Sequence, residues 1–126
     1  MSIWQRVKKY VNSVTNNDTE TAAELGLAHV VEVWPSQPLA NQKLEVRYAG
    51  ELAGDSRQVF MHYGIQTDEE NEWKYINDIR MQKRSDGIYT AVFQVPSSPG
   101  KLSMCFHNEY DEWDNNQGKN WIYPLQ

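Results

Sequence analysis

The stretch SDGIYTAVFQVPSSPGKLSMCF, residues 85–106, holds two alternating apolar patterns, each of which follows a turn signal. Ser85-Asp86-Gly87 forms the first turn, and the Pro- and Gly-containing segment 96–100 forms the second. Successive side chains of a strand point to opposite faces, so the spacing predicts two short strands that each bury one face. The predicted buried residues are Tyr89, Ala91, Phe93 and Val95 in the first strand, and Leu102, Met104 and Phe106 in the second.

The same period of two extends outward from this stretch in both directions. Apolar residues alternate over 31–33, 44–48, 59–63 and 121–125, and residues 73–79 are less regular but extended in character. Turn-forming Gly, Pro and Asp residues separate these segments. Seven or eight short strands at this spacing predict a mainly β fold, an immunoglobulin-like antiparallel β-sandwich.

The N-terminal segment has a different period. Ile3, Val7, Tyr10 and Val14 recur at helical spacing, and a second short helix is expected to end at Gly26. We therefore expect one or two α-helices in residues 1–27 and a β-sandwich module in residues 28–126. The apolar stripe of the first helix fits either packing against the sandwich or a homodimer formed through this helix.

Composition excludes several classes of partner. The chain has 126 residues, enough for one domain, and a net charge of −5 with a pI of about 5.1 disfavours nucleic acid. No stretch approaches the roughly 20 apolar residues of a membrane span. The single cysteine cannot form an internal disulfide and no secretion signal is visible, so a cytoplasmic location is expected.

Aromatic residues mark three candidate functional positions. They make up 12% of the chain and include five Trp, more than a core of this size easily buries. His62 lies on the outward face of a predicted strand, and Trp73 follows the acidic run 68–72. The polar segment 109–121 is rich in turn formers and is expected to present Trp113 on the surface as part of a loop.

This combination of side chains suits sugar binding. A pyranose has an apolar face of C–H groups, which an indole ring covers, and a rim of hydroxyls, which amides and imidazoles bind. Asn115 and Asn116 follow Trp113 after one intervening residue, Asp114, and would supply such polar contacts.

The chain resembles the family 25 carbohydrate-binding modules and the related family 53 starch-binding modules over residues 29–126. The resemblance rests on His62-Tyr63-Gly64, on Trp73, on Asp86-Gly87 before Tyr89, and on the string WDNNQGKNW at 113–121. It implies a β-sandwich that binds α-1,4-linked glucan (starch, glycogen or a maltooligosaccharide) without catalysis, cofactor or metal. Carried over by position, the site residues are His62, Trp73 and Trp113, with polar contacts from Asn115 and Asn116, whereas Trp121 belongs to the core.

Other readings of the acidic segment remain open. Glu109, Asp111, Glu112 and Asp114 could in principle form a glycosidase carboxylate pair, but a single small sandwich offers little cleft, and solvated turn acids are favoured. Asp111, Asp114 and Asn115 are possible calcium ligands without the alternating spacing of a calcium loop.

A protein-interaction domain is the alternative function, because immunoglobulin-like sandwiches host many unrelated activities. Trp73 and Trp113 would then be anchors for a protein partner. Zinc and nucleophilic chemistry are disfavoured, because Cys105 has no special setting and the histidines lie far apart without zinc spacing, at His29, His62 and His107.

Overall fold

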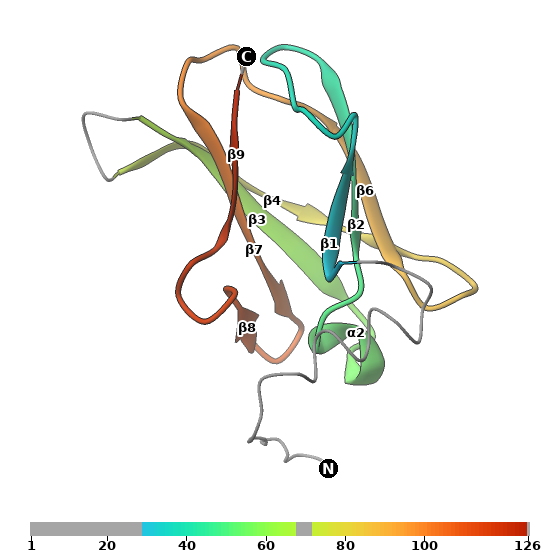
Figure 1. Ribbon diagram of the computed structural model, residues 1–126. Coiled ribbons are helices and arrows are strands. Elements are labelled where there is room, and N and C mark those ends of the chain that lie inside the picture. Colours follow the sequence, from blue (N-terminus) through green and yellow to red (C-terminus); the bar gives the residue numbers. More distant parts are fainter. Residues whose placement is uncertain (1–28, 68–71, 126) are drawn as a thin grey trace.

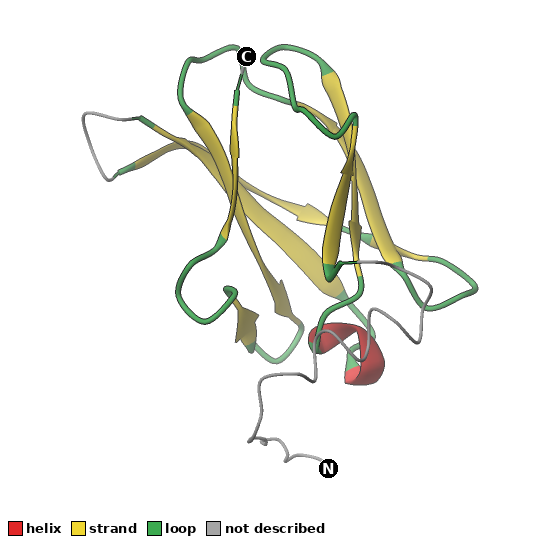
Figure 2. Cartoon of the chain, viewed as in Figure 1, coloured by secondary structure: helices red, strands yellow, loops and turns green. Residues whose placement is uncertain are grey.

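The computed structural model describes residues 29–67 and 72–125 (Figure 1). The helices predicted in residues 1–27 lie outside the described residues, and so do the two possibilities raised for the first helix, packing against the sandwich and a homodimer. Within the described ranges the fold is mainly β, with nine strands and one short helix, α2 (Leu52–Asp55), between β2 and β3 (Figure 2). None of the helical structure in this part of the chain is long and apolar enough to cross a membrane.

The strands form two antiparallel sheets that face each other as a sandwich (Figure 1). The first sheet has the order β1-β2-β6-β5, and the second has the order β4-β3-β7-β8 with β9 also paired to β7. The strands of the first sheet are β1 (Val31–Trp34), β2 (Lys43–Tyr48), β6 (Tyr89–Gln94) and β5 (Gln82–Lys83). Those of the second are β4 (Trp73–Arg80), β3 (Val59–Gln66), β7 (Lys101–Asn108), β8 (Trp113–Asp114) and β9 (Trp121–Pro124).

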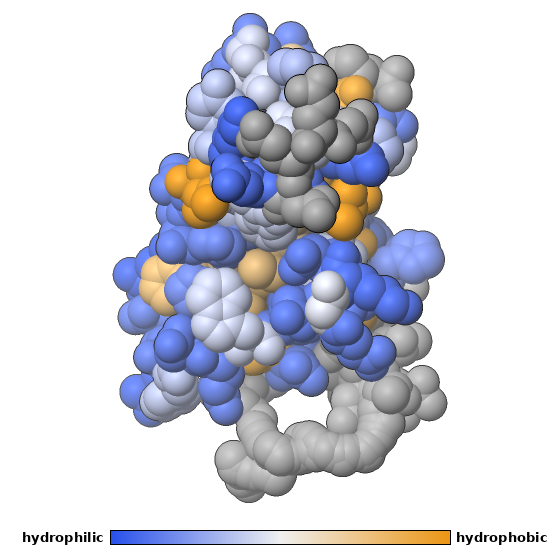
Figure 3. All heavy atoms as spheres, turned by 90° about the vertical axis from the view of Figure 1, so that its left-hand side faces the viewer, coloured by the Kyte–Doolittle hydropathy of each residue, from blue (hydrophilic) through white to orange (hydrophobic). Residues whose placement is uncertain are grey.

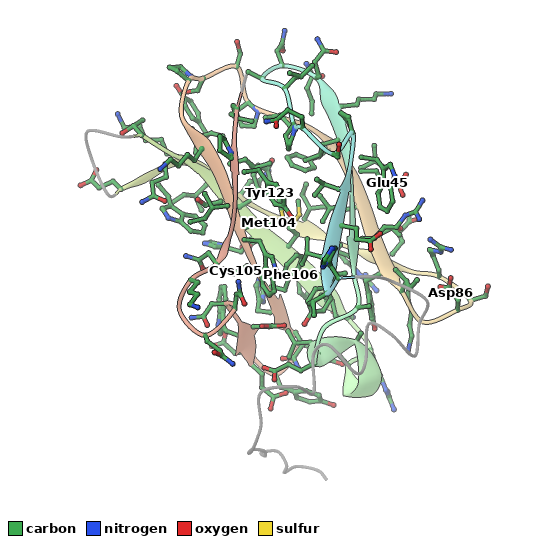
Figure 4. All side chains as sticks on the ribbon, in the orientation of Figure 1. Glu45, Asp86, Met104, Cys105, Phe106 and Tyr123 are labelled. Atoms are coloured by element: carbon green, nitrogen blue, oxygen red, sulfur yellow. The ribbon has the colours of Figure 1, made fainter. Side chains whose placement is uncertain are left out.

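The core lies between the two sheets and confirms the alternation predicted from residues 85–106. Every apolar position predicted in that stretch is buried. Figure 4 labels Met104, Cys105 and Phe106, and the first and last of these belong to the core cluster between the sheets. Trp121 packs against the same cluster, with its ring edge on Phe106 at a centroid distance of 5.4 Å. Trp121 therefore faces the core, as predicted, although it is only partly buried.

The segment after β7 differs from the expected loop. Trp113 and Asp114 form the short strand β8, whose register pairs Trp113 with His107 and Asp114 with Phe106. Sequence periodicity missed β8 because two residues are too short to show a period. Trp113 is therefore part of the second sheet, where β8 pairs with β7.

Candidate functional site

The outer face of the second sheet gathers a group of aromatic side chains that lie outside the core. Residues Val59, Met61, Tyr63 and Ile65 of β3 are buried, so Phe60 and His62 point away from the core. Their rings contact side chains from three other strands of the sheet, β4, β7 and β8. We call this cluster the aromatic platform; its members are Phe60, His62, Trp73, His107 and Trp113.

His62 is the centre of the platform. Its ring stacks on Trp73 with centroids 5.8 Å apart and an interplanar angle of 29°, and it meets Trp113 edge-on at 5.3 Å and 85°. The structure therefore brings together the three aromatic residues that were predicted as site residues. The ring of His62 is closer to parallel with the indole of Trp73 and nearly perpendicular to that of Trp113. The two indole planes are therefore inclined to each other.

His107 extends the platform beneath Trp113. The two rings lie 4.4 Å apart at 31°, and the opposite neighbour of His107 is Phe60, stacked at 5.0 Å and 13°. Strand register explains the arrangement, since His107 pairs with Phe60 on one side and with Trp113 on the other. His107 was not among the predicted site residues, because nothing in the sequence shows that β7 lies between β3 and β8.

Asp78 joins the two platform histidines. Its Oδ1 lies 2.8 Å from Nδ1 of His62 and 3.3 Å from Nε2 of His107. Burial alone would raise the pKa of Asp78, but hydrogen bonds and charge attraction from the two imidazoles hold it below the ordinary value of 3.8. The carboxylate is therefore ionised at neutral pH and accepts from both rings.

A β-bulge in β4 makes this arrangement possible. The register with β3 shifts between Tyr63 and Ile65, and Tyr75 of β4 has a φ of 56°. Opposite the bulge, Gly64 leaves room for its neighbours: a Cβ there would lie 3.2 Å from the Cβ of Trp73 and 3.1 Å from the carbonyl oxygen of Lys74. The glycine in His-Tyr-Gly thus lets Trp73 approach the sheet next to His62.

The acidic residues around Trp113 have structural partners. Asp111 accepts a hydrogen bond from the indole Nε1 of Trp113 at 3.0 Å, and Glu109 accepts from the backbone N–H of Arg57 at 2.9 Å. The expectation of solvated turn acids is wrong for Asp114, which is only 4% exposed. It is buried because β8 turns its side chain towards the hydroxyl of Tyr48.

Asn115 and Asn116 both take part in holding the loop between β8 and β9. The Oδ1 of Asn115 accepts from the backbone N–H of Gly118 at 2.9 Å, and Nδ2 of Asn116 donates to the carbonyl oxygen of Asn120 at 2.9 Å. Positive φ values recur through this loop, at 58° for Asn116 and 88° for Gly118. The prediction that its Asn and Gly residues adopt turn conformations is confirmed.

Figure 3 views the molecule from the side of the second sheet. Hydrophilic side chains cover much of this face, with pale and hydrophobic residues between them. Across residues 29–67 and 72–125, no group of three or more His, Cys, Asp or Glu side chains is arranged to hold a metal ion.

No protein-family model matches the chain. Among curated proteins, it is similar to an alpha-amylase of Clostridium acetobutylicum, with 33% identity over 86 residues. The match includes 68% of this chain but only 10% of the amylase, so the chain corresponds to a small part of that protein.

Proposed function

We propose that this chain is a non-catalytic module that binds α-1,4-linked glucan, as starch, glycogen or a maltooligosaccharide, through the aromatic platform. The observation that carries the proposal is the convergence of Trp73, His62 and Trp113 on one exposed sheet face. Aromatic rings on the outside of a sheet, bordered by carboxylate and amide groups, match the alternating C–H faces and hydroxyl rims of a glucan.

The angle between the indoles favours an α-linked over a β-linked chain. A β-1,4-linked glucan is a flat ribbon and would stack best on coplanar rings. An α-1,4-linked glucan curves, so successive sugars can face two rings that are inclined to each other. The 85° angle between His62 and Trp113, beside the 29° angle between His62 and Trp73, gives the platform that inclination.

Polar groups beside the platform would orient the ligand. The exposed Asn115 uses its Oδ1 within the loop, and its amide NH₂ has no hydrogen bond to the part of the chain that the structure describes. It would donate to a sugar hydroxyl, as the resemblance to family 25 modules implies. Asn116 would contribute mainly by fixing the loop that follows Trp113.

The similarity to an alpha-amylase supports a starch-related ligand. It covers a tenth of that protein, a share that suits an accessory module better than a catalytic domain. The acids around the platform also support binding without catalysis, because Asp78 and Asp111 are hydrogen-bonded to platform rings and Asp114 is buried against Tyr48.

Modest affinity is expected. Stacking that hides about 60–80 Å² of apolar surface gives roughly 2 kcal/mol for each ring, and desolvation of hydroxyls offsets much of it. The dissociation constant for an oligosaccharide is therefore expected in the micromolar to millimolar range.

Calorimetric titration with maltoheptaose tests the proposal. Trp113→Ala should abolish measurable binding, whereas Trp34→Ala is a matched control: Trp34 is exposed to nearly the same extent, 42% against 44%, but lies on the first sheet. Cello-oligosaccharide should give no heat.

Two results would contradict the proposal. Equal weakening by the two Trp variants would show that the platform is not the site. Absence of both heat and tryptophan fluorescence change with every glucan would remove the glucan function and leave protein partners as the alternative.

A further inference from the structure

The geometry points to Asp78 as the positioning residue of the platform. We propose that its carboxylate fixes His62 as the Nδ1–H tautomer, so that Nε2 is left as a hydrogen-bond acceptor for a ligand hydroxyl. This inference rests on the proposed glucan-binding function for its ligand, but its structural part can be tested without any glucan.

The tautomer follows from the partners of the ring. Asp78 is ionised and can only accept, so Nδ1 of His62, 2.8 Å away, must carry the proton. A neutral imidazole has one N–H, and Nε2 therefore has a free lone pair. Within the described residues Nε2 has no hydrogen-bond partner, and the side chain is 25% exposed.

The same oxygen constrains the second histidine. His107 presents Nε2 to Asp78 at 3.3 Å, and its ring packs at 4.4 Å against Trp113. One carboxylate oxygen therefore sets the orientation of two imidazoles, and each imidazole contacts an indole of the platform. Loss of Asp78 would release both rings, although its own side chain is part of no aromatic contact.

The experiment compares the ring nitrogens of the histidines by long-range ¹H–¹⁵N NMR, at a pH where the imidazoles are neutral, in the unmodified chain, D78A and D78N. We expect His62 to be the Nδ1–H tautomer in the unmodified chain and to lose that preference in D78A. In D78N the amide oxygen can still accept, so the tautomer should be retained.

Maltoheptaose titration of the same proteins measures the effect of Asp78 on ligand affinity. D78A should weaken binding about tenfold, the loss expected for one well-placed hydrogen bond, and D78N should recover most of it. D86A is the matched control, because Asp86 is a half-exposed carboxylate paired with Arg84 at 2.7 Å on the hairpin between β5 and β6 of the first sheet, whereas the platform is on the second sheet. Figure 4 labels Asp86 on this hairpin.

Three outcomes would overturn the inference. One is an Nε2–H tautomer for His62 in the unmodified chain, which needs no variant to be seen. Another is a folded D78A protein that keeps both the Nδ1–H tautomer and full affinity. The third is a D78N protein as weak as D78A. If the unmodified chain binds no glucan, the proposed function fails, and the tautomer comparison alone still decides the role of Asp78.

Discussion

The hydroxyl of Tyr48 lies 2.6 Å from Oδ2 of Asp114 and joins the two sheets across the interior. Tyr48 is on β2 of the first sheet and Asp114 is on β8 of the second, directly after Trp113. The same hydroxyl accepts a hydrogen bond from the backbone N–H of Leu52 at 3.1 Å. A buried contact therefore holds the short strand that presents one of the two platform indoles.

Tyr48→Phe should destabilise the fold. It removes a hydrogen bond to a buried carboxylate, for which a loss of about 2 kcal/mol in the free energy of unfolding is expected. Urea denaturation followed by tryptophan fluorescence measures it. Maltoheptaose affinity should also fall, because β8 is less firmly held, and an unfolding free energy equal to that of the unmodified chain would contradict the role given to this contact.

Gly64→Ala should weaken glucan binding more than it weakens the fold. The new Cβ would lie 3.2 Å from both Cγ1 of Ile76 and Cβ of Trp73, so these neighbours must shift by a few tenths of an ångström, and we expect the shift to disturb the stacking of Trp73 on His62. Titration with maltoheptaose should show at least a threefold loss of affinity, equivalent to about 0.7 kcal/mol. Gly54→Ala is the matched control, since a Cβ there meets nothing within 4 Å. Equal affinity in the two variants would show that binding does not depend on the space that Gly64 leaves beside Trp73.

Cys105 should be chemically protected in the folded chain. Burial, followed by the negative charges of Asp114 and Asp78, raises the pKa of its thiol to about 11 from an ordinary 9.0. The thiolate fraction at pH 8 is therefore about a hundredfold lower than in an unfolded chain. Iodoacetamide labelling, quantified by mass spectrometry with and without denaturant, should show at least that difference in rate. Rapid labelling under native conditions would contradict the burial of Cys105.

The ionisation of Asp78 should make stability fall in acid. Its folded-state pKa is lower than its unfolded value near 3.8, so its contribution is complete at higher pH and is lost as the pH falls through the folded-state value. The difference in unfolding free energy between the unmodified chain and D78N should shrink from about pH 5 to about pH 2. Denaturant titrations across that range measure it, and a difference that does not change with pH would show that Asp78 contributes nothing through its charge.

The alternation of apolar residues was enough to predict the sandwich and its buried face. Val46, Met61 and Met104 are all fully buried, and each lies in a stretch with a period of two. The helix α2 and the strands β5 and β8 are too short to carry such a period, so the sequence pattern does not predict them.

The platform could be predicted only in part, because a bulge reverses the alternation along β4. Trp73 and Asp78 are five residues apart, an odd separation that places side chains on opposite faces of a regular strand. Both nevertheless contact His62 on the outer face, because the irregularity at Tyr75 shifts the register by one residue. The position of His107 depends on strand order, which the sequence pattern does not contain.

The platform lies on the outer face of a sheet, on hydrogen-bonded strands, and this has a consequence for the glucan binding proposed above. A glucan chain can bind to such a face and leave it laterally, so binding does not require a free chain end. A long polymer could therefore be bound at any interior segment, and each of these segments would be a separate binding site. Several copies of the module could then occupy one polymer molecule at once.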